Sequence, residues 1–165
     1  MNAESSARPV LTSTAEITSN WLSSALASDN ETLSISDVAI DPIGVGIGIL
    51  SLLFRLTRTY ESGRGSSSLI AKIAPPNEIV RMIAAGYGFY GTEVAIYKNF
   101  STELKLRPPE LYYAAHDTNS DDFVILMEDL GHLRTADQLE GCRVDDARAI
   151  VHQLALPLPS GKTIG

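Results

Sequence analysis

Apolar and polar residues follow two periods along this chain, one typical of strands and one typical of helices. Alternation is clearest over 52–60, where Leu52, Phe54 and Leu56 fall on one side and Arg55 and Thr57 on the other, as in a half-buried strand. Arg58 is the one residue out of phase. Shorter apolar runs bounded by turn residues predict further strands at 33–42, 69–74, 110–115 and 123–127.

Helical periodicity recurs in three segments. Ser13 and Glu16 have capping-box spacing and predict a helix over about 14–27. Apolar residues at steps of three and four indicate helix over 78–100, but its glycines are expected to split it and leave the firmer helix at 90–100. A last amphipathic helix is predicted at 144–155. Runs of strands around one inserted helix predict an α+β fold.

Composition narrows the class of protein. The chain has 165 residues, 44% of them hydrophobic and 20% charged, which suits one globular domain. Its net charge of −7 argues against a nucleic-acid partner. Cys142 is the only cysteine, so no intramolecular disulfide can form. The start of the chain lacks a signal-peptide pattern, and the longest apolar stretch is too short to cross a bilayer. We expect a cytoplasmic protein with no membrane partner.

Three glycines, Gly44, Gly46 and Gly48, lie between two predicted strands. Glycine lets backbone N–H groups approach phosphate oxygens closely. A glycine-rich hairpin with no ligand is the alternative. A dinucleotide site of the Rossmann type is disfavoured, because Ile49 occupies the position of a required glycine and a strand pattern follows.

Lys72 lies in the otherwise apolar predicted strand at 69–74. An edge lysine that points to water is one interpretation. In a kinase, a lysine at this place holds the α- and β-phosphates and needs a helix carboxylate to orient it. Glu93 is the candidate, although a lone helix carboxylate is more often solvated. Glu78 is a rival that lies close to the Pro75-Pro76 break.

The segment Phe-Val-Ile-Leu-Met-Glu-Asp-Leu-Gly at 123–131 is an apolar strand that runs into a polar turn. Alone it fits any buried strand. In kinase-type folds, backbone groups at this hinge bind the edge of adenine. Each of these features, the glycines, the lysine, the carboxylate and the hinge segment, is weak evidence alone. Their order and spacing along one chain are together a specific indication of a kinase-type fold.

Over residues 14–155 the chain resembles the N-terminal lobe of the aminoglycoside phosphotransferase-like superfamily, and within it the ecdysteroid kinase-like (choline-kinase-related) group. The resemblance is carried by Ile-Gly-Val-Gly-Ile-Gly, Ser-Leu-Ile-Ala-Lys-Ile, Tyr-Gly-Thr-Glu-Val-Ala-Ile-Tyr and Phe-Val-Ile-Leu-Met-Glu-Asp-Leu. It implies a protein-kinase-like N-lobe, with a five-stranded antiparallel sheet, an inserted helix, and an N-terminal and a C-terminal helix.

The resemblance also implies a ligand and an activity. Relatives transfer the γ-phosphoryl group of ATP to a hydroxyl of a small molecule, with Mg²⁺ in the full-length family. In this chain, Glu93 would orient the lysine. The phosphates would lie at Gly44, Gly46, Gly48 and Lys72, and adenine at Met127, Glu128, Asp129 and Leu130.

The chain departs from the family in its catalytic half. The family's His-Gly-Asp…Asn loop belongs to a second, helical lobe, and no His-Gly-Asp occurs here. The segment His132-Leu-Arg134 resembles the start of such a loop, but Asp137 is not at the distance from His132 that the motif requires. We therefore expect no catalytic residue and no metal ligand in this chain, and a small-molecule acceptor only if a C-lobe is supplied.

The expected organisation is a disordered segment at 1–13, the N-lobe at 14–155 and an unrelated short tail at 156–165, as in a truncated gene product. Within the tail, Gly161-Lys162-Thr163 matches the last three residues of a P-loop motif. That motif also needs a glycine five residues before Gly161, where this chain has Leu156. Without a second lobe, an apolar helix face is left for self-association: Ile150, Val151 and Leu154.

Two functions from other classes stay open at the level of sequence. One is a non-catalytic nucleotide-binding or protein-interaction module. The other is an α+β domain with no nucleotide site.

Overall fold

Five antiparallel strands form one sheet in the computed structural model, which describes residues 10–27, 33–44, 50–100, 107–133 and 141–154. The strand order across the sheet is β1-β2-β3-β5-β4. The five-stranded antiparallel sheet expected from the sequence is thereby confirmed. The strands are β1 (Ser34–Ile43), β2 (Leu52–Ser62), β3 (Ser68–Ile73), β4 (Leu111–His116) and β5 (Phe123–Glu128).

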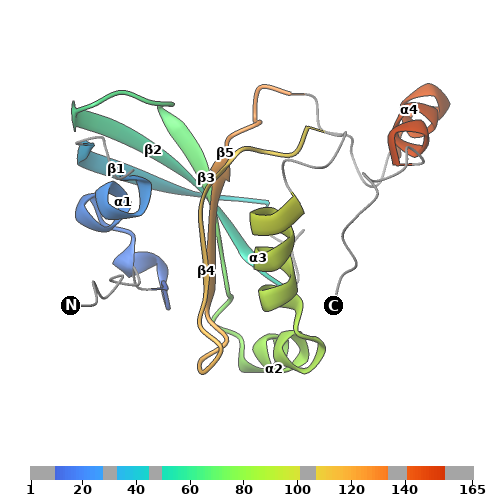
Figure 1. Cartoon of the computed structure of the whole chain (residues 1–165), viewed down its shortest axis with the longest axis horizontal. Helices are drawn as coiled ribbons and strands as arrows, with labels where there is room; N and C mark the ends of the chain where they lie inside the picture. The colour runs from blue at the N-terminus through green and yellow to red at the C-terminus, as the bar shows by residue number, and fades with distance from the viewer. Residues whose placement is uncertain (1–9, 28–32, 45–49, 101–106, 134–140, 155–165) are drawn as a thin grey trace.

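Helices cover both faces of this sheet (Figure 1). On one face lie η1 (Thr14–Glu16) and α1 (Ser19–Leu26). The opposite face, here called the α3 face, is covered by α2 (Glu78–Tyr87) and α3 (Phe89–Phe100). The last helix, α4 (Val144–Leu154), stands apart from the sheet in Figure 1. The fold is α+β, as predicted, and is consistent with a kinase-like N-lobe.

A hydrophobic cluster lies on each side of the sheet. Leu22 of α1 packs with Leu69 and Leu126 on one side, and Tyr90 of α3 packs with Ile125 on the α3 face. Successive strand residues point to opposite faces. Central strands buried on both faces therefore have nearly continuous apolar runs, as β5 does over 123–127 and β3 does apart from Lys72.

The predicted N-terminal helix begins later than its capping-box spacing indicated. Ser13 makes no side-chain cap, and a single 3₁₀ turn follows it. The α-helix instead begins after Thr18, whose hydroxyl accepts the Trp21 N–H at 3.1 Å. Glu16 accepts the Thr12 N–H, so its carboxylate is directed away from the expected cap. Leu11, inside the segment predicted to be disordered, is 1% exposed and belongs to the core.

The long helical stretch is split at Gly88, in agreement with the effect expected of its glycines. Gly88 has φ 63° and ψ 30°, the left-handed conformation that commonly ends a helix, and its N–H bonds the Ala84 and Ala85 carbonyls. Asn77 caps the start of α2 by accepting the Ile79 and Val80 N–H groups. The break turns α3 back along the sheet as a separate helix.

Arg58, out of phase in the alternating strand, is buried in β2 and 7% exposed. Its Nε donates to the Ser66 carbonyl at 2.7 Å, and its guanidinium lies over the rings of Tyr60 and Tyr112. Burial lowers the pKa of its guanidinium from the usual value. Aromatic faces and one carbonyl thus compensate for a cation at an apolar position.

None of the helices in the described part of the chain is both long enough and apolar enough to cross a lipid bilayer.

We predict that Gly88→Ala and Gly86→Ala have opposite effects on stability. At Gly88 a side chain is strained by the positive φ, so alanine should lower the free energy of unfolding by about 1 kcal/mol. Gly86 lies inside α2 with no atom within 4 Å of an added Cβ, so alanine should raise it by up to about 1 kcal/mol. Urea denaturation measures both, and equal effects would contradict the assigned break.

Candidate functional site

Lys72 and Glu93 form an ion pair that joins the middle of the sheet to α3. Lys72 lies opposite Leu53 of β2 and Ile125 of β5, so its side chain is on the α3 face. It is not an edge lysine, because β3 lies between β2 and β5. The rival Glu78 begins α2, and Glu93 is the carboxylate that the ammonium contacts.

Packing of α3 explains why Glu93 reaches the sheet. Tyr90 and Val94, on either side of it in sequence, are 1% and 5% exposed. The Tyr90 ring stacks on that of Phe123 with centroids 4.3 Å apart. One turn later the Tyr97 hydroxyl contacts the Met127 sulfur at 3.6 Å. These contacts fix the helix face that carries the carboxylate.

Only one of the three predicted glycines can be placed. Gly44 follows β1 with φ +63° and no atom within 4 Å of an added Cβ. A left-handed residue here fits a turn between β1 and β2. Gly46 and Gly48 lie outside the described residues.

The predicted adenine hinge, residues 127–130, follows directly from β5. Met127 lies opposite Ile70 on the α3 face and is 9% exposed. Glu128 lies opposite Leu69, so its side chain points to the other face. There its carboxylate accepts Arg107 Nη2 at 2.8 Å and 3.0 Å, and the Arg107 hydrogen bond lowers its pKa. Its backbone N–H is occupied too, since it donates to the Glu110 carbonyl at 2.9 Å.

Asp129 is tied to both strands next to the hinge. It accepts Arg55 Nε at 2.7 Å and Nη2 at 3.2 Å, Ser68 Oγ at 2.8 Å, and the Gly131 N–H at 2.9 Å. The Arg55 hydrogen bond is the main reason that the pKa of this carboxyl falls to about 2. Arg55 and Ser68 were not identified as site residues from the sequence. The strand alternation placed Arg55 on the same side of β2 as Leu53, but it did not indicate that Arg55 or Ser68 would meet Asp129.

This cluster borders a hollow of about 410 Å³ beside the hinge. Arg55 lies opposite Ile70, so the hollow is on the α3 face of the sheet, as Lys72 is. His132, from the segment that imitates a catalytic loop, lines it too, while Asp137 lies outside the described residues. The lining residues are Arg55, Thr57, Ser67, Ser68, Asp129, Gly131 and His132.

No group of three or more His, Cys, Asp or Glu side chains that could hold a metal is found among the residues that the structure describes. On α4, Ile150 and Val151 are 52% and 64% exposed. The side chain of Leu154, their predicted companion, lies outside the description.

A sheet whose central lysine is paired with a helix glutamate, next to an apolar strand that ends in a hinge, is consistent with the N-lobe of a kinase-like protein. The chain belongs to the ecdysteroid kinase-like family, whose sequence profile matches residues 46–156. Lys72, Glu93 and the hinge lie inside the matched region. Neither a curated protein nor a solved structure matches the chain at a significant level.

We predict that Asp129→Asn lowers stability in a pH-dependent way. The folded-state pKa of Asp129 is about 2 and its ordinary value is 3.8, so its stabilising effect is complete above about pH 4 and is lost as the pH falls towards 2. The variant should be about 1–2 kcal/mol less stable at pH 7, and this deficit should shrink in acid.

Asp145→Asn is the matched control, since Asp145 pairs with Arg148 but both side chains are more than 70% exposed. It should leave the free energy of unfolding nearly unchanged at every pH. Chemical denaturation at several pH values measures both variants. A deficit for Asp129→Asn that is independent of pH would contradict the assigned ion pair.

Proposed function

We propose that this chain is the nucleotide-binding half of a small-molecule kinase and that it binds ATP through the α3 face of its sheet. The observation that carries this proposal is the Lys72–Glu93 ion pair on the central strand. Membership in the ecdysteroid kinase-like family supports a phosphotransferase role.

The chemistry of the pair suits phosphate. A lysine ammonium has three donors, and Glu93 accepts one of them in the structure. The remaining donors can bind phosphate oxygens while the carboxylate keeps the side chain oriented. The Lys72 side chain is 20% exposed, so it is not completely enclosed by the protein. We propose that Gly44, Gly46 and Gly48 supply backbone N–H groups to the same phosphates; of these, only Gly44 is among the described residues.

The base would lie against the α3 face next to the hinge. Ile70 and Met127 are apolar residues of this face but are only 8% and 9% exposed, so the room for the base is the hollow beside Asp129. The Glu128 and Asp129 carboxylates are already bonded to arginines, and the Glu128 N–H and the Leu130 carbonyl are bonded to backbone groups. We therefore propose that the remaining backbone groups of 128–130 bind the adenine edge.

We further propose that the 165-residue chain binds ATP without transferring its phosphoryl group. Phosphoryl transfer depends on positioning and charge stabilisation by a catalytic Asp, an Asn and metal-binding groups. The sequence contains no His-Gly-Asp to supply them. Transfer to a hydroxyl acceptor would therefore need a second lobe.

A non-catalytic interaction module is the second candidate, and the exposed apolar residues of α4 favour it. Such a module needs no nucleotide, so one titration separates the two proposals.

Calorimetric titration with Mg-ATP tests the proposal on wild type, Lys72→Ala and Lys98→Ala. Loss of a charge-assisted contact of about 1.5–3 kcal/mol should weaken binding by about tenfold or more in Lys72→Ala. Lys98 is exposed near the end of α3 and its removal makes the same change in net charge, so that variant should bind like wild type.

Both variants should keep most of the wild-type free energy of unfolding. Absence of saturable binding to the wild type at millimolar ATP would contradict the proposal and leave the interaction module. Equal affinities of Lys72→Ala and Lys98→Ala would remove Lys72 from the site.

A further inference from the structure

Tyr90 makes a contact that packing alone does not require. It is the second residue of α3, it is 1% exposed, and its ring stacks on Phe123. Its hydroxyl donates to the backbone carbonyl of Leu50 at 2.8 Å. Leu50 lies two residues before the start of β2, the strand that pairs with β3.

The Leu50 carbonyl lies outside the regular sheet, since the β2–β3 ladder begins at Leu52. A phenylalanine would fill the same space as Tyr90 but would leave this carbonyl without the bond. Burial raises the pKa of the Tyr90 hydroxyl, so the group stays protonated and acts as the donor. The hydroxyl therefore fixes a specific piece of backbone to α3.

Tyr90 and Glu93 are three residues apart and lie on the same side of α3. One helical turn thus makes two polar contacts with the sheet: Tyr90 to Leu50 and Glu93 to Lys72. Leu53, three residues after Leu50, lies opposite Lys72 in the β2–β3 ladder. This one turn of α3 therefore fixes the position of the start of β2 relative to the Lys72 side chain.

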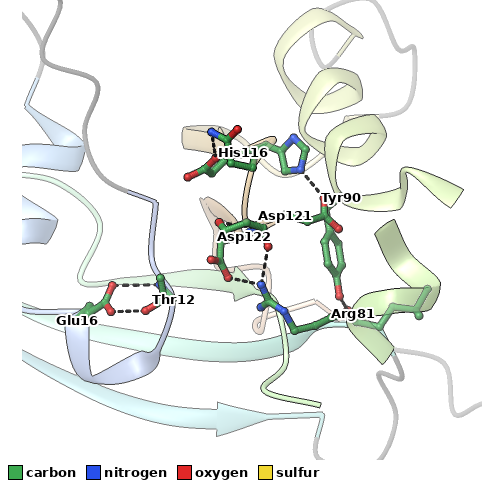
Figure 2. Close-up of polar contacts among 11 residues, drawn as sticks. Thr12, Glu16, Arg81, Tyr90, His116, Asp121 and Asp122 are labelled. Atoms are coloured by element: carbon green, nitrogen blue, oxygen red, sulfur yellow. Dashed lines mark hydrogen bonds and ion pairs between the residues drawn. The ribbon is translucent and has the colours of Figure 1, made fainter. Parts of the chain in front are cut away.

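The start of α3 is itself held by the turn between β4 and β5. His116 contacts Asp121 at 2.7 Å, and its ring lies where a Cβ on Gly91 would come within 3.1 Å of it. Arg81 of α2 bonds Asp122 at 2.7 Å. Figure 2 shows Tyr90 close to these side chains, between His116 and Arg81. The contacts around the start of α3 therefore hold the Tyr90 side chain in one position.

We propose that Tyr90 is a positioning residue for nucleotide phosphates: through Leu50 it aligns the start of β2 with the Lys72 ammonium. This inference rests on the proposed function, because it assumes that Lys72 binds the phosphates. It predicts that the Tyr90 hydroxyl matters for ATP and not for adenosine, which has the same base and ribose but no phosphate.

The test compares Tyr90→Phe with Tyr97→Phe in the full 165-residue chain. Both variants remove a phenolic hydroxyl from the same face of α3, but within the described part of the chain the hydrogen-bond partner of the Tyr97 hydroxyl is the Met127 sulfur. Amide hydrogen exchange without nucleotide should be faster at residues 50–53 in Tyr90→Phe and unchanged there in Tyr97→Phe. ATP affinity should fall about 3- to 10-fold in Tyr90→Phe, the effect of one lost hydrogen bond, with adenosine affinity within about twofold of wild type.

Two results would overturn the inference alone, provided that wild type binds ATP in a Lys72-dependent manner. One is an equal loss of ATP and adenosine affinity, which would indicate a general structural role. The other is unchanged exchange at 50–53 in Tyr90→Phe. Failure of wild type to bind ATP at all would overturn the proposed function and this inference together.

Discussion

The ion pair between Lys72 and Glu93 is the interaction on which the geometry of the candidate site depends. The Lys72 side chain lies on the central strand of the sheet and is only 20% exposed, and a partly buried charge is costly unless an opposite charge meets it. The carboxylate belongs to α3. The ion pair therefore requires one position of α3 along the sheet and one rotation of α3 about its own axis. The chain break at Gly88 and the burial of Tyr90 and Val94 produce that placement.

The hinge is positioned by the same sheet. Asp129 follows β5 and is bonded to Arg55 of β2 and Ser68 of β3. Lysine and hinge are therefore held relative to each other by strand register, which is rigid, and not by a loop of independent conformation. Groups mounted on regular elements keep their geometry better than groups on loops. This rigidity is what a site needs if it is to bind base and phosphates of one nucleotide at once.

Strands and the helix break could be predicted from the sequence because each leaves a local signal. β3 and β5 are apolar on both faces, and Gly88 adopts a conformation that favours glycine. The Arg55–Asp129 pair left no such signal, since its members are 74 residues apart and meet only once the order β2-β3-β5 is known. The first helix was placed too early because Ser13 has the right spacing, whereas Thr18 makes the actual cap.

A double-mutant cycle of ATP affinity on Lys72 and Glu93 tests the central claim most directly. If Glu93 acts by orienting the lysine, Glu93→Gln weakens ATP binding when Lys72 is present and has no effect in the Lys72→Ala background. The account predicts this full coupling. Weakening by the same factor in both backgrounds would show that the two residues act independently, and would contradict it.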